Sequence, residues 1–267
     1  MKKIAIICIF WAIISGFSIP GLAQTDINLI DTPTAKVLSK NSYYLNFRFY
    51  QGGGILLQGW AGLIERLTIG ASYGGVGVVG IGQIIGNPEP AFSLKYNLGE
   101  EGENFPFALA AGYEGQGYGR YYRQGEMING CELTKSFYQI NSKGFYLALT
   151  KKLKNLNFQI HGGVNHCLEN DPGKADISFF LGTEFEITPK FIIKLEYNNG
   201  FHNKIKPEDV FKNPCAIELR KAGGEINLGL KVRYSSALIL EIGFKDLSGV
   251  YTENGNRIFQ IAYVGEF

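Results

Sequence analysis

Residues Gly223–Leu247 read GGEINLGLKVRYSSALILEIGFKDL and contain two runs in which apolar and polar side chains alternate. In the first run every second residue from 226 to 234 is apolar or aromatic, and the residues between them include Lys231 and Arg233. A second run, from 238 to 244, repeats the pattern after a short turn. A period of two indicates β-strands with one apolar face, and the short link makes the pair a hairpin. The apolar face must contact either a protein core or the acyl chains of a membrane.

The same period recurs along the chain and gives twelve strand candidates. They span 42–50, 55–63, 67–74, 90–98, 106–114, 143–151, 156–168, 176–187, 190–198, 224–234, 237–247 and 257–267. Short connections alternate with mostly longer ones, so the two kinds fall at opposite ends of the strands. Bacterial transmembrane barrels show this asymmetry, with short periplasmic turns and longer outer loops.

Aromatic residues are concentrated near both ends of these strands, whereas the middle of each apolar face is mostly Leu, Ile and Ala. Two aromatic belts around an aliphatic band are typical of a bilayer-spanning surface, because aromatic rings prefer the headgroup boundary. Charges on the opposite faces would each cost about 2–4 kcal/mol in hydrocarbon near the midplane, so we expect them to point inward. The expected lumen-facing residues are Arg48, Lys95, Glu114, His161, Glu184, Glu186, Lys194, Glu196, Lys231, Arg233, Glu241 and Lys245. The sequence therefore predicts an all-β fold, an antiparallel transmembrane β-barrel of about 12 strands.

The N-terminus has the pattern of a secretory signal peptide. Lys2 and Lys3 precede the apolar run IAIICIFWAIISGF, and the small residue Ala23 ends a plausible cleavage site. We divide the chain into a signal peptide (1–23), an N-terminal lead-in segment (24–41) and the β-barrel (42–267). Loss of the two lysines lowers the basic residues from 26 to 24, equal to the 24 acidic ones. This balance gives no electrostatic reason to expect nucleic acid as a partner.

The chain ends in RIFQIAYVGEF, where Phe259, Ile261, Tyr263 and Phe267 share one phase. This ending resembles that of bacterial outer-membrane β-barrel proteins, whose last strand commonly ends in Phe and serves as the signal to the barrel-assembly machinery. Gly265 departs from the pattern, which favours an apolar or aromatic residue there. The resemblance implies export to the cell outer membrane, with outer-membrane lipid, lipopolysaccharide and the barrel-assembly machinery as partners.

A narrower resemblance involves IDTPTAKVL (Ile30–Leu38), which is similar to a segment that precedes the barrel in YjbH-like outer-membrane proteins linked to exopolysaccharide production. GLIERLTIGASYGG (Gly62–Gly75) and SKGFYLALTKKL (Ser142–Leu153) also look like barrel hairpins of that group. The resemblance covers a scaffold, so it implies a location and a tie to surface-polysaccharide export, and no reaction. On its residues alone, Ile30–Leu38 is equally well a proline turn that leads into the first strand.

No motif indicates catalysis, and we expect no catalytic, metal or cofactor site. The predicted function is a non-enzymatic scaffold or a small passive pore. One alternative is a rim-located outer-membrane lipid hydrolase that uses His161 or His166, although no Ser lies one strand step from His166 on its own strand. The other alternative is a soluble lipocalin-like binder. Among the cysteines, Cys131 and Cys215 are a possible disulfide between outer loops.

Two long connections are expected to decide whether the lumen is open. The segment 75–89 is apolar and rich in glycine, and we expect it to be a packed loop. The segment 115–142 begins with Arg and Tyr residues that suit either contact with lipopolysaccharide or an extended aromatic girdle.

Overall fold

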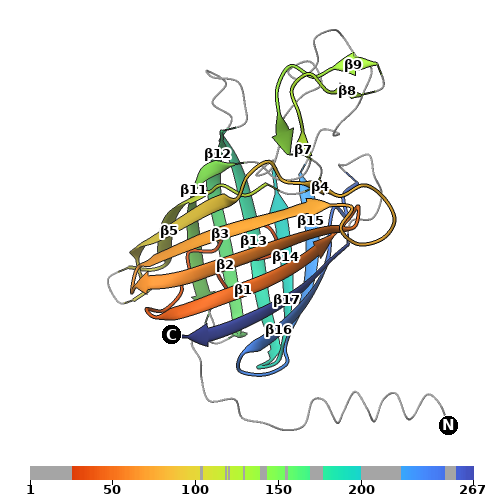
Figure 1. The fold of residues 1–267 in the computed structure, drawn as a ribbon. Helices are drawn as coiled ribbons and strands as arrows, with labels where there is room; N and C mark the ends of the chain where they lie inside the picture. The colour runs from red at the N-terminus through yellow and green to blue at the C-terminus, as the bar shows by residue number, and fades with distance from the viewer. Residues whose placement is uncertain are drawn as a thin grey trace, which may run out of the picture.

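The computed structural model describes residues 26–102, 105–117, 119, 121–128, 130–138, 143–153, 156–168, 177–199, 224–249 and 257–267. Twelve long strands form one closed antiparallel barrel (Figure 1). They are β1 (Ser42–Tyr50), β2 (Gly54–Ile64), β3 (Leu67–Val76), β5 (Ala91–Gly99), β6 (Ala108–Glu114), β11 (Gly144–Leu153), β12 (Phe158–Cys167), β13 (Ile177–Thr188), β14 (Phe191–Asn198), β15 (Glu225–Arg233), β16 (Leu238–Phe244) and β17 (Arg257–Glu266).

Each long strand pairs with the next one along the chain, and β1 pairs with β17 to close the barrel. The predicted all-β, 12-stranded antiparallel barrel is therefore confirmed, and the predicted strand ends lie within three residues of the observed ones. Short strands were not predicted: β4 (Ile85–Gly86), β7 (Tyr121–Tyr122), β8 (Met127–Ile128), β9 (Cys131–Glu132) and β10 (Phe137–Tyr138). Among the residues described, no helix is both long enough and apolar enough to cross a membrane.

The opening hairpin shows how the wall is built. In the β15–β16 register Leu230 lies opposite Ile242, and Lys231 lies opposite Glu241. Leu228, Leu230 and Ile242 are exposed on the outside of the barrel, whereas Lys231 and Glu241 are buried inside it. The apolar face therefore has no protein core to cover it.

Aromatic side chains pair between β1 and β17 at both ends of this wall. Tyr43 and Tyr263 stack with ring centroids 6.2 Å apart at the end where β1 begins, and Phe49 and Phe259 stack at 6.2 Å near the end where β1 stops. These pairs lie in the same outward phase as Leu45, which is exposed. The arrangement matches an aliphatic band bordered by aromatic belts.

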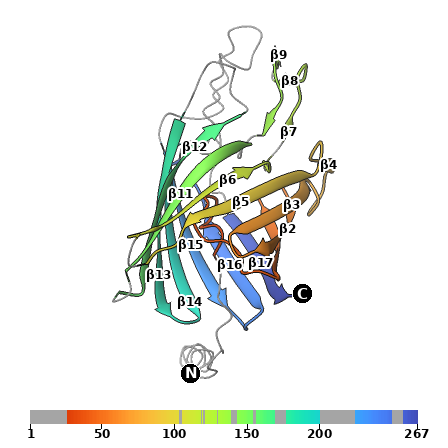
Figure 2. The same ribbon diagram turned by 90° about the vertical axis from the view of Figure 1, so that its left-hand side faces the viewer.

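The lumen is filled by residues 26–38, which we call the lumen hairpin (red in Figure 2). Ile27, Leu29, Ile30, Ala35 and Leu38 are each at most 4% exposed. The hairpin enters from the end of the barrel where the connections are short, because it continues through Asn41 directly into β1. The expectation that the long connections decide whether the lumen is open was wrong, since the chain's own N-terminal segment occupies it.

Apolar residues on the inner face of the wall pack against this hairpin. Leu56 and Tyr50 cluster with Ile30, while Trp60 clusters with Ile27 and with Leu38. The inner face of β2 thus carries two large apolar side chains, Leu56 and Trp60, on either side of the polar Gln58. At Gly182, a Cβ would lie 2.3 Å from Cδ1 of Leu29, so an inner-wall glycine gives the hairpin room.

The connection 75–89 does not pack as expected. Val79, Ile81 and Ile84 are more than half exposed, and Ile81 contacts almost nothing. The loop is held through its backbone, because the N–H of Gly77 donates to the Gly52 carbonyl oxygen at 2.8 Å. The prediction failed because an apolar composition does not by itself bury a loop at the rim of a barrel whose lumen is already full.

The connection 115–142 forms two small sheets, β7–β10 and β8–β9, beyond the long-connection end of the barrel (Figure 1). Cross-strand aromatic contacts hold the first sheet: Tyr121 packs on Tyr138 with centroids 4.8 Å apart, and Tyr122 on Phe137 at 5.1 Å. Part of this connection, including Tyr118 and Arg120, lies outside the described residues.

Candidate functional site

The tip of the lumen hairpin is a tight turn. The N–H of Leu29 donates to the Thr32 carbonyl oxygen at 2.8 Å, and the N–H of Thr34 donates to the Ile27 carbonyl oxygen at 3.0 Å. Asn28 and Pro33 form an isolated antiparallel bridge between the two arms. Proline fits here because its missing N–H is not needed for these bonds. The turn leaves the N–H groups of residues 30–32 to be satisfied by the barrel wall.

Glu196 on β14 satisfies these N–H groups. Its Oε2 accepts hydrogen bonds from the backbone N–H groups of Ile30, Asp31 and Thr32 at 2.9–3.1 Å, and from the Thr32 hydroxyl at 2.8 Å. Its Oε1 accepts a bond from Asn227 Nδ2 at 2.8 Å. Successive N–H groups that converge on one anion form a nest, and here the anion is a fully buried carboxylate of the wall.

Asp31 places a second carboxylate between two cations of the wall. One of its oxygens pairs with the guanidinium of Arg48 on β1, and the other lies 2.5 Å from Nζ of Lys245, the residue after β16. Arg48 also donates to the carbonyl oxygen of Ile30 at 3.0 Å, and Lys245 lies 3.3 Å from Glu225 Oε1. The tip is therefore held by charges of both signs from three separated parts of the barrel.

The other end of the hairpin is anchored in the same way. Asp26 pairs with Lys231 on β15, and its second oxygen lies 4.0 Å from the guanidinium of Arg233. Burial alone would raise the pKa of the Asp26 carboxyl, but the ammonium groups around it, chiefly that of Lys231, hold this pKa well below its usual range. Lys194 on β14 donates to the Leu29 carbonyl oxygen at 2.9 Å and forms an ion pair with Glu241 on β16.

Polar groups of the remaining wall bind the second arm of the hairpin. The N–H of Ala35 donates to the Thr150 hydroxyl at 2.9 Å, and the N–H of Leu38 donates to the Thr68 hydroxyl at 2.8 Å. Lys36 forms an ion pair with Glu184 at 3.2 Å. Buried backbone groups are costly when they lack a partner, so these bonds are what allows an irregular segment to sit inside a barrel.

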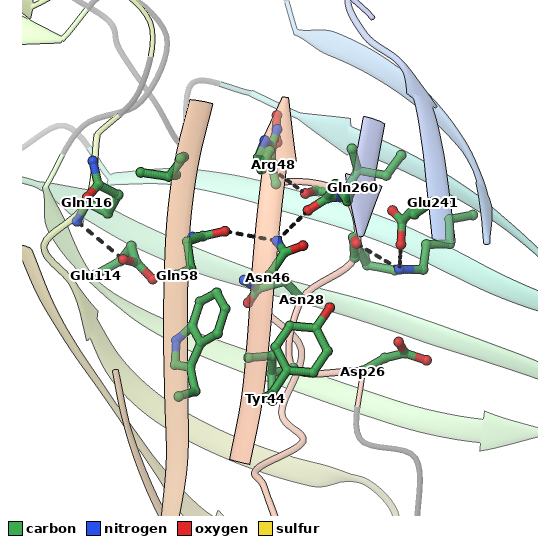
Figure 3. A pocket seen from close by; sticks show the side chains of 17 residues that line it. Asp26, Asn28, Tyr44, Asn46, Arg48, Gln58, Glu114, Gln116, Glu241 and Gln260 are labelled. Carbon is green, nitrogen blue, oxygen red and sulfur yellow. Dashed lines mark hydrogen bonds and ion pairs between the residues drawn. The ribbon is translucent and has the colours of Figure 1, made fainter. Parts of the chain in front are cut away.

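The space left beside the hairpin is small. A cavity of about 40 Å3 lies between the hairpin and the inner face of β2, β1 and β17 (Figure 3). Gln58, Asn46 and Gln260 form a row of amides there: Asn46 Nδ2 donates to Gln58 Oε1 at 3.1 Å and to Gln260 Oε1 at 2.7 Å. A water molecule needs about 10–15 Å3 on the same measure, so the cavity has room for a few water molecules and is too small for an organic solute.

The structure places the twelve residues expected in the lumen on the inner side of the barrel. Nine are buried, and Glu114, Glu186 and Arg233 are half-buried. Eight of the twelve contact the lumen hairpin: Arg48, Lys95, Glu184, Lys194, Glu196, Lys231, Arg233 and Lys245. Sequence reasoning missed the hairpin residues that meet them, chiefly Asp26 and Asp31. Leu56 and Trp60 on the inner face of β2 indicate that an apolar segment lies inside the lumen, but they do not identify Asp26 or Asp31.

The two described histidines, His161 and His166, lie on opposite faces of β12 and do not form one site. Nδ1 of His161 lies 2.9 Å from the Thr150 hydroxyl, and its Nε2 lies 3.6 Å from Glu184, but all three residues are buried beneath the hairpin. His166 is on the outward face of β12, where its cross-strand neighbours are Phe145 and Ile177. Among the described residues, no cluster of His, Cys, Asp and Glu could hold a metal ion.

The remaining predicted residues are placed as follows. Phe259, Ile261 and Tyr263 lie on β17, and the N–H of Phe267 donates to the Asn41 carbonyl oxygen at 2.9 Å. Cys131 is disulfide-bonded, while Cys215 lies outside the described residues. Cys167 is a buried thiol. The signal peptide also lies outside the described part of the chain.

A closed antiparallel barrel with an apolar exterior and a polar, filled interior has the architecture of outer-membrane β-barrels. No protein-family model matches the chain, and no curated protein is similar to it in sequence. Solved structures that it resembles include the KdgM porin in complex with disordered oligogalacturonate (8% identity, covering 85% of this chain and 99% of that one, TM-score 0.48). Others are Omp33 of Acinetobacter baumannii (7%, 85% and 97%, 0.42) and outer membrane phospholipase A from Escherichia coli (10%, 86% and 94%, 0.38).

Likenesses of this size carry no inference about ligand or reaction, so the barrel assignment rests on the strand pairing and exposed surfaces described above. The narrower resemblance to YjbH-like proteins finds no support in these comparisons.

Proposed function

We propose that the protein is a non-enzymatic integral outer-membrane β-barrel that its own N-terminal hairpin keeps closed. The observation that carries this proposal is the lumen hairpin itself. It fills the barrel, its backbone is bonded to wall residues from opposite sides, and the cavity beside it, of about 40 Å3, is too small for an organic solute. In this state we expect the described part of the barrel to offer no path for a solute.

The membrane location follows from the outer surface. Large apolar side chains such as Leu181, Leu195 and Leu228 are exposed around the barrel, and a soluble protein rarely exposes so continuous an apolar band. A lipocalin-like binder would instead keep such side chains inside. Outer-membrane lipid and lipopolysaccharide are the partners that this surface fits. The barrel-assembly machinery is a further proposed partner, through Phe259, Tyr263 and the terminal Phe267.

Of the two predicted roles, the filled lumen favours a scaffold over a pore that is always open. A tie to surface-polysaccharide export remains part of the proposal, and it rests on the resemblance of Ile30–Leu38. The contacts that Ile30–Leu38 make inside the barrel also give this segment a structural role that does not depend on any glycan. The lipid-hydrolase alternative has no comparable support, since His161 is sealed and His166 lies among apolar side chains.

Planar-bilayer recording tests the proposal with two matched substitutions. Ala35 is fully buried against Ala108 and Ala110, so Ala35→Trp cannot fit and should expel the hairpin without changing the wall. Lys40→Trp changes an exposed residue outside the hairpin and is the control. The native chain and Lys40→Trp should show no conductance steps, and Ala35→Trp should show them.

Two results would contradict the proposal. Native protein that conducts in steps would show an open lumen. Ala35→Trp protein that still shows the heat-modifiable gel mobility of a folded barrel, yet does not conduct, would show that something other than the hairpin closes the lumen.

A further inference from the structure

Asp31 engages three side chains of the barrel wall at once. Its N–H donates to Glu196 Oε2 at 3.0 Å, one carboxylate oxygen pairs with Arg48, and the other lies 2.5 Å from Lys245 Nζ. Asp31 therefore presents a hydrogen-bond donor to an acid and a carboxylate to two cations. Only its Cα and Cβ separate these two groups. This is the pattern by which a binding site recognises a small amino-carboxylate.

Two of these wall residues, Glu196 and Lys245, have wall contacts that do not involve the hairpin, whereas the second contact of Arg48 is to the Ile30 carbonyl oxygen. Asn227 Nδ2 donates to the second oxygen of Glu196 at 2.8 Å, and Glu225 lies 3.3 Å from Lys245. The strands that carry them belong to the closed barrel, so their positions are fixed by the wall. All three are buried, which strengthens electrostatic interactions with whatever lies between them.

We propose that Arg48, Lys245 and Glu196 form a binding site for small amino-carboxylate solutes, and that Asp31 occupies this site as a resident pseudo-ligand. Solute binding and hairpin docking then exclude each other. This inference rests on the proposed function, because the site becomes available only when the hairpin leaves the lumen. The spacing in Asp31 corresponds to a β-amino acid, in which the ammonium replaces the N–H and the carboxylate is kept.

Charge selects this class of solute over simpler ions. A plain carboxylate would gain the two cations but would leave Glu196 Oε2 without the donors of the hairpin tip, with only Asn227 bound to its other oxygen, and close to a like charge. A plain amine would gain Glu196 but would be repelled by Arg48 and Lys245. A buried charge without a partner is strongly unfavourable, so only a solute that carries both groups satisfies the whole site.

Equilibrium binding of radiolabelled β-alanine in lipid nanodiscs tests the inference. The full chain with Ala35→Trp keeps every residue of the site and should bind β-alanine at least about tenfold more tightly than the native chain, whose Asp31 competes. Unlabelled β-alanine should displace the label at about tenfold lower concentration than acetate or ethylamine. Adding Lys245→Met or Glu196→Gln to Ala35→Trp should weaken binding by about tenfold or more, the effect of removing one charge-assisted hydrogen bond.

Equal binding by the native chain and Ala35→Trp, or binding that Lys245→Met leaves unchanged, would overturn the inference. Conductance of the same Ala35→Trp protein separates the two proposals. A variant that conducts but does not bind β-alanine refutes the binding site alone, and a folded variant that neither conducts nor binds refutes both.

A second variant keeps the test decisive if Ala35→Trp does not fold. Asp31→Gly removes only the carboxymethyl group, and acetate has the size and charge to replace it. Acetate should then slow hydrogen exchange at the Thr32 amide by about tenfold relative to chloride at equal ionic strength. The native chain should show no such effect, because the Asp31 carboxylate already occupies the position that acetate would take. If acetate has no effect on Asp31→Gly, the anionic half of the site does not exist.

Discussion

Glu196→Gln should release the lumen hairpin while leaving the barrel folded. In the native chain one carboxylate oxygen accepts four hydrogen bonds from the hairpin tip. A hydrogen bond to a charged group contributes about 1.5–3 kcal/mol and a neutral one about 0.5–1.5 kcal/mol, so each bond loses roughly 1 kcal/mol when the charge is removed. Four donors share one oxygen and cannot all have ideal geometry. We therefore expect a total loss of about 2–3 kcal/mol in hairpin docking.

This loss corresponds to a roughly 30- to 140-fold larger undocked population. Hydrogen exchange of the amides of Ile30, Asp31 and Thr32 in lipid nanodiscs measures it directly, because these N–H groups exchange only when the tip leaves Glu196. The rate of exchange should rise by the same factor, while amides of β14 and β15 keep their protection.

Glu186→Gln is the matched control. Glu186 also lies on the inner side of the wall. Its carboxylate forms an ion pair with Arg233 at 3.0 Å and makes no hydrogen bond to the hairpin tip. Its substitution should change tip exchange less than about threefold. The reasoning is refuted if Glu196→Gln leaves tip exchange unchanged, or if Glu186→Gln raises it as much.

Three further predictions follow from the wall, the hairpin and the outer loops. Leu228→Lys should lower the free energy of unfolding in lipid vesicles by about 2–4 kcal/mol in urea titration, because the ammonium would face hydrocarbon near the midplane. Trp60→Ala removes the ring that packs on the hairpin near Leu38, and truncations of this size cost about 3–5 kcal/mol, so hairpin amides should exchange faster. A non-reduced peptide map should show Cys131 linked to Cys215, with a mass lower by two hydrogen atoms than the sum of the two thiol peptides.

Tyr234→Lys, directly after the end of β15, is the control for Leu228→Lys. It should lower the free energy of unfolding by no more than about 1 kcal/mol. An equal cost at positions 228 and 234 would argue against a bilayer midplane at Leu228. Unchanged hairpin exchange in Trp60→Ala would show that the apolar contact contributes little, and three free thiols would reject the disulfide.

The barrel could be predicted from the sequence because its signal is local. A period of two needs only neighbouring residues to be visible, as in Ile226–Val232, and the alternation of short and long connections orients the strands. Apolar and polar residues do not alternate clearly along 55–63, and the structure gives the physical reason: Leu57 faces outward, but Leu56 and Trp60 have apolar partners on the inside.

The lumen hairpin could not be predicted in the same way. Residues 26–38 have no regular period, and a proline turn explains Pro33 equally well. The contacts that place the hairpin tip on Glu196 join residues 164 to 166 positions apart, as between Thr32 and Glu196 or Ile30 and Glu196. Such pairings have no signature in a single sequence. The inner charges were visible as a set, but their partners Asp26 and Asp31 lie before the first strand, where no alternation marks the side they face.

The most direct test of the barrel assignment is the accessibility of spin labels at Leu228 and Leu240 in reconstituted vesicles. Both labels should collide readily with oxygen dissolved in the bilayer and hardly at all with a water-soluble nickel complex, because both side chains point toward acyl chains. Frequent collisions with nickel, or immobilisation by tight protein packing, would mean that the apolar face touches water or a protein interior.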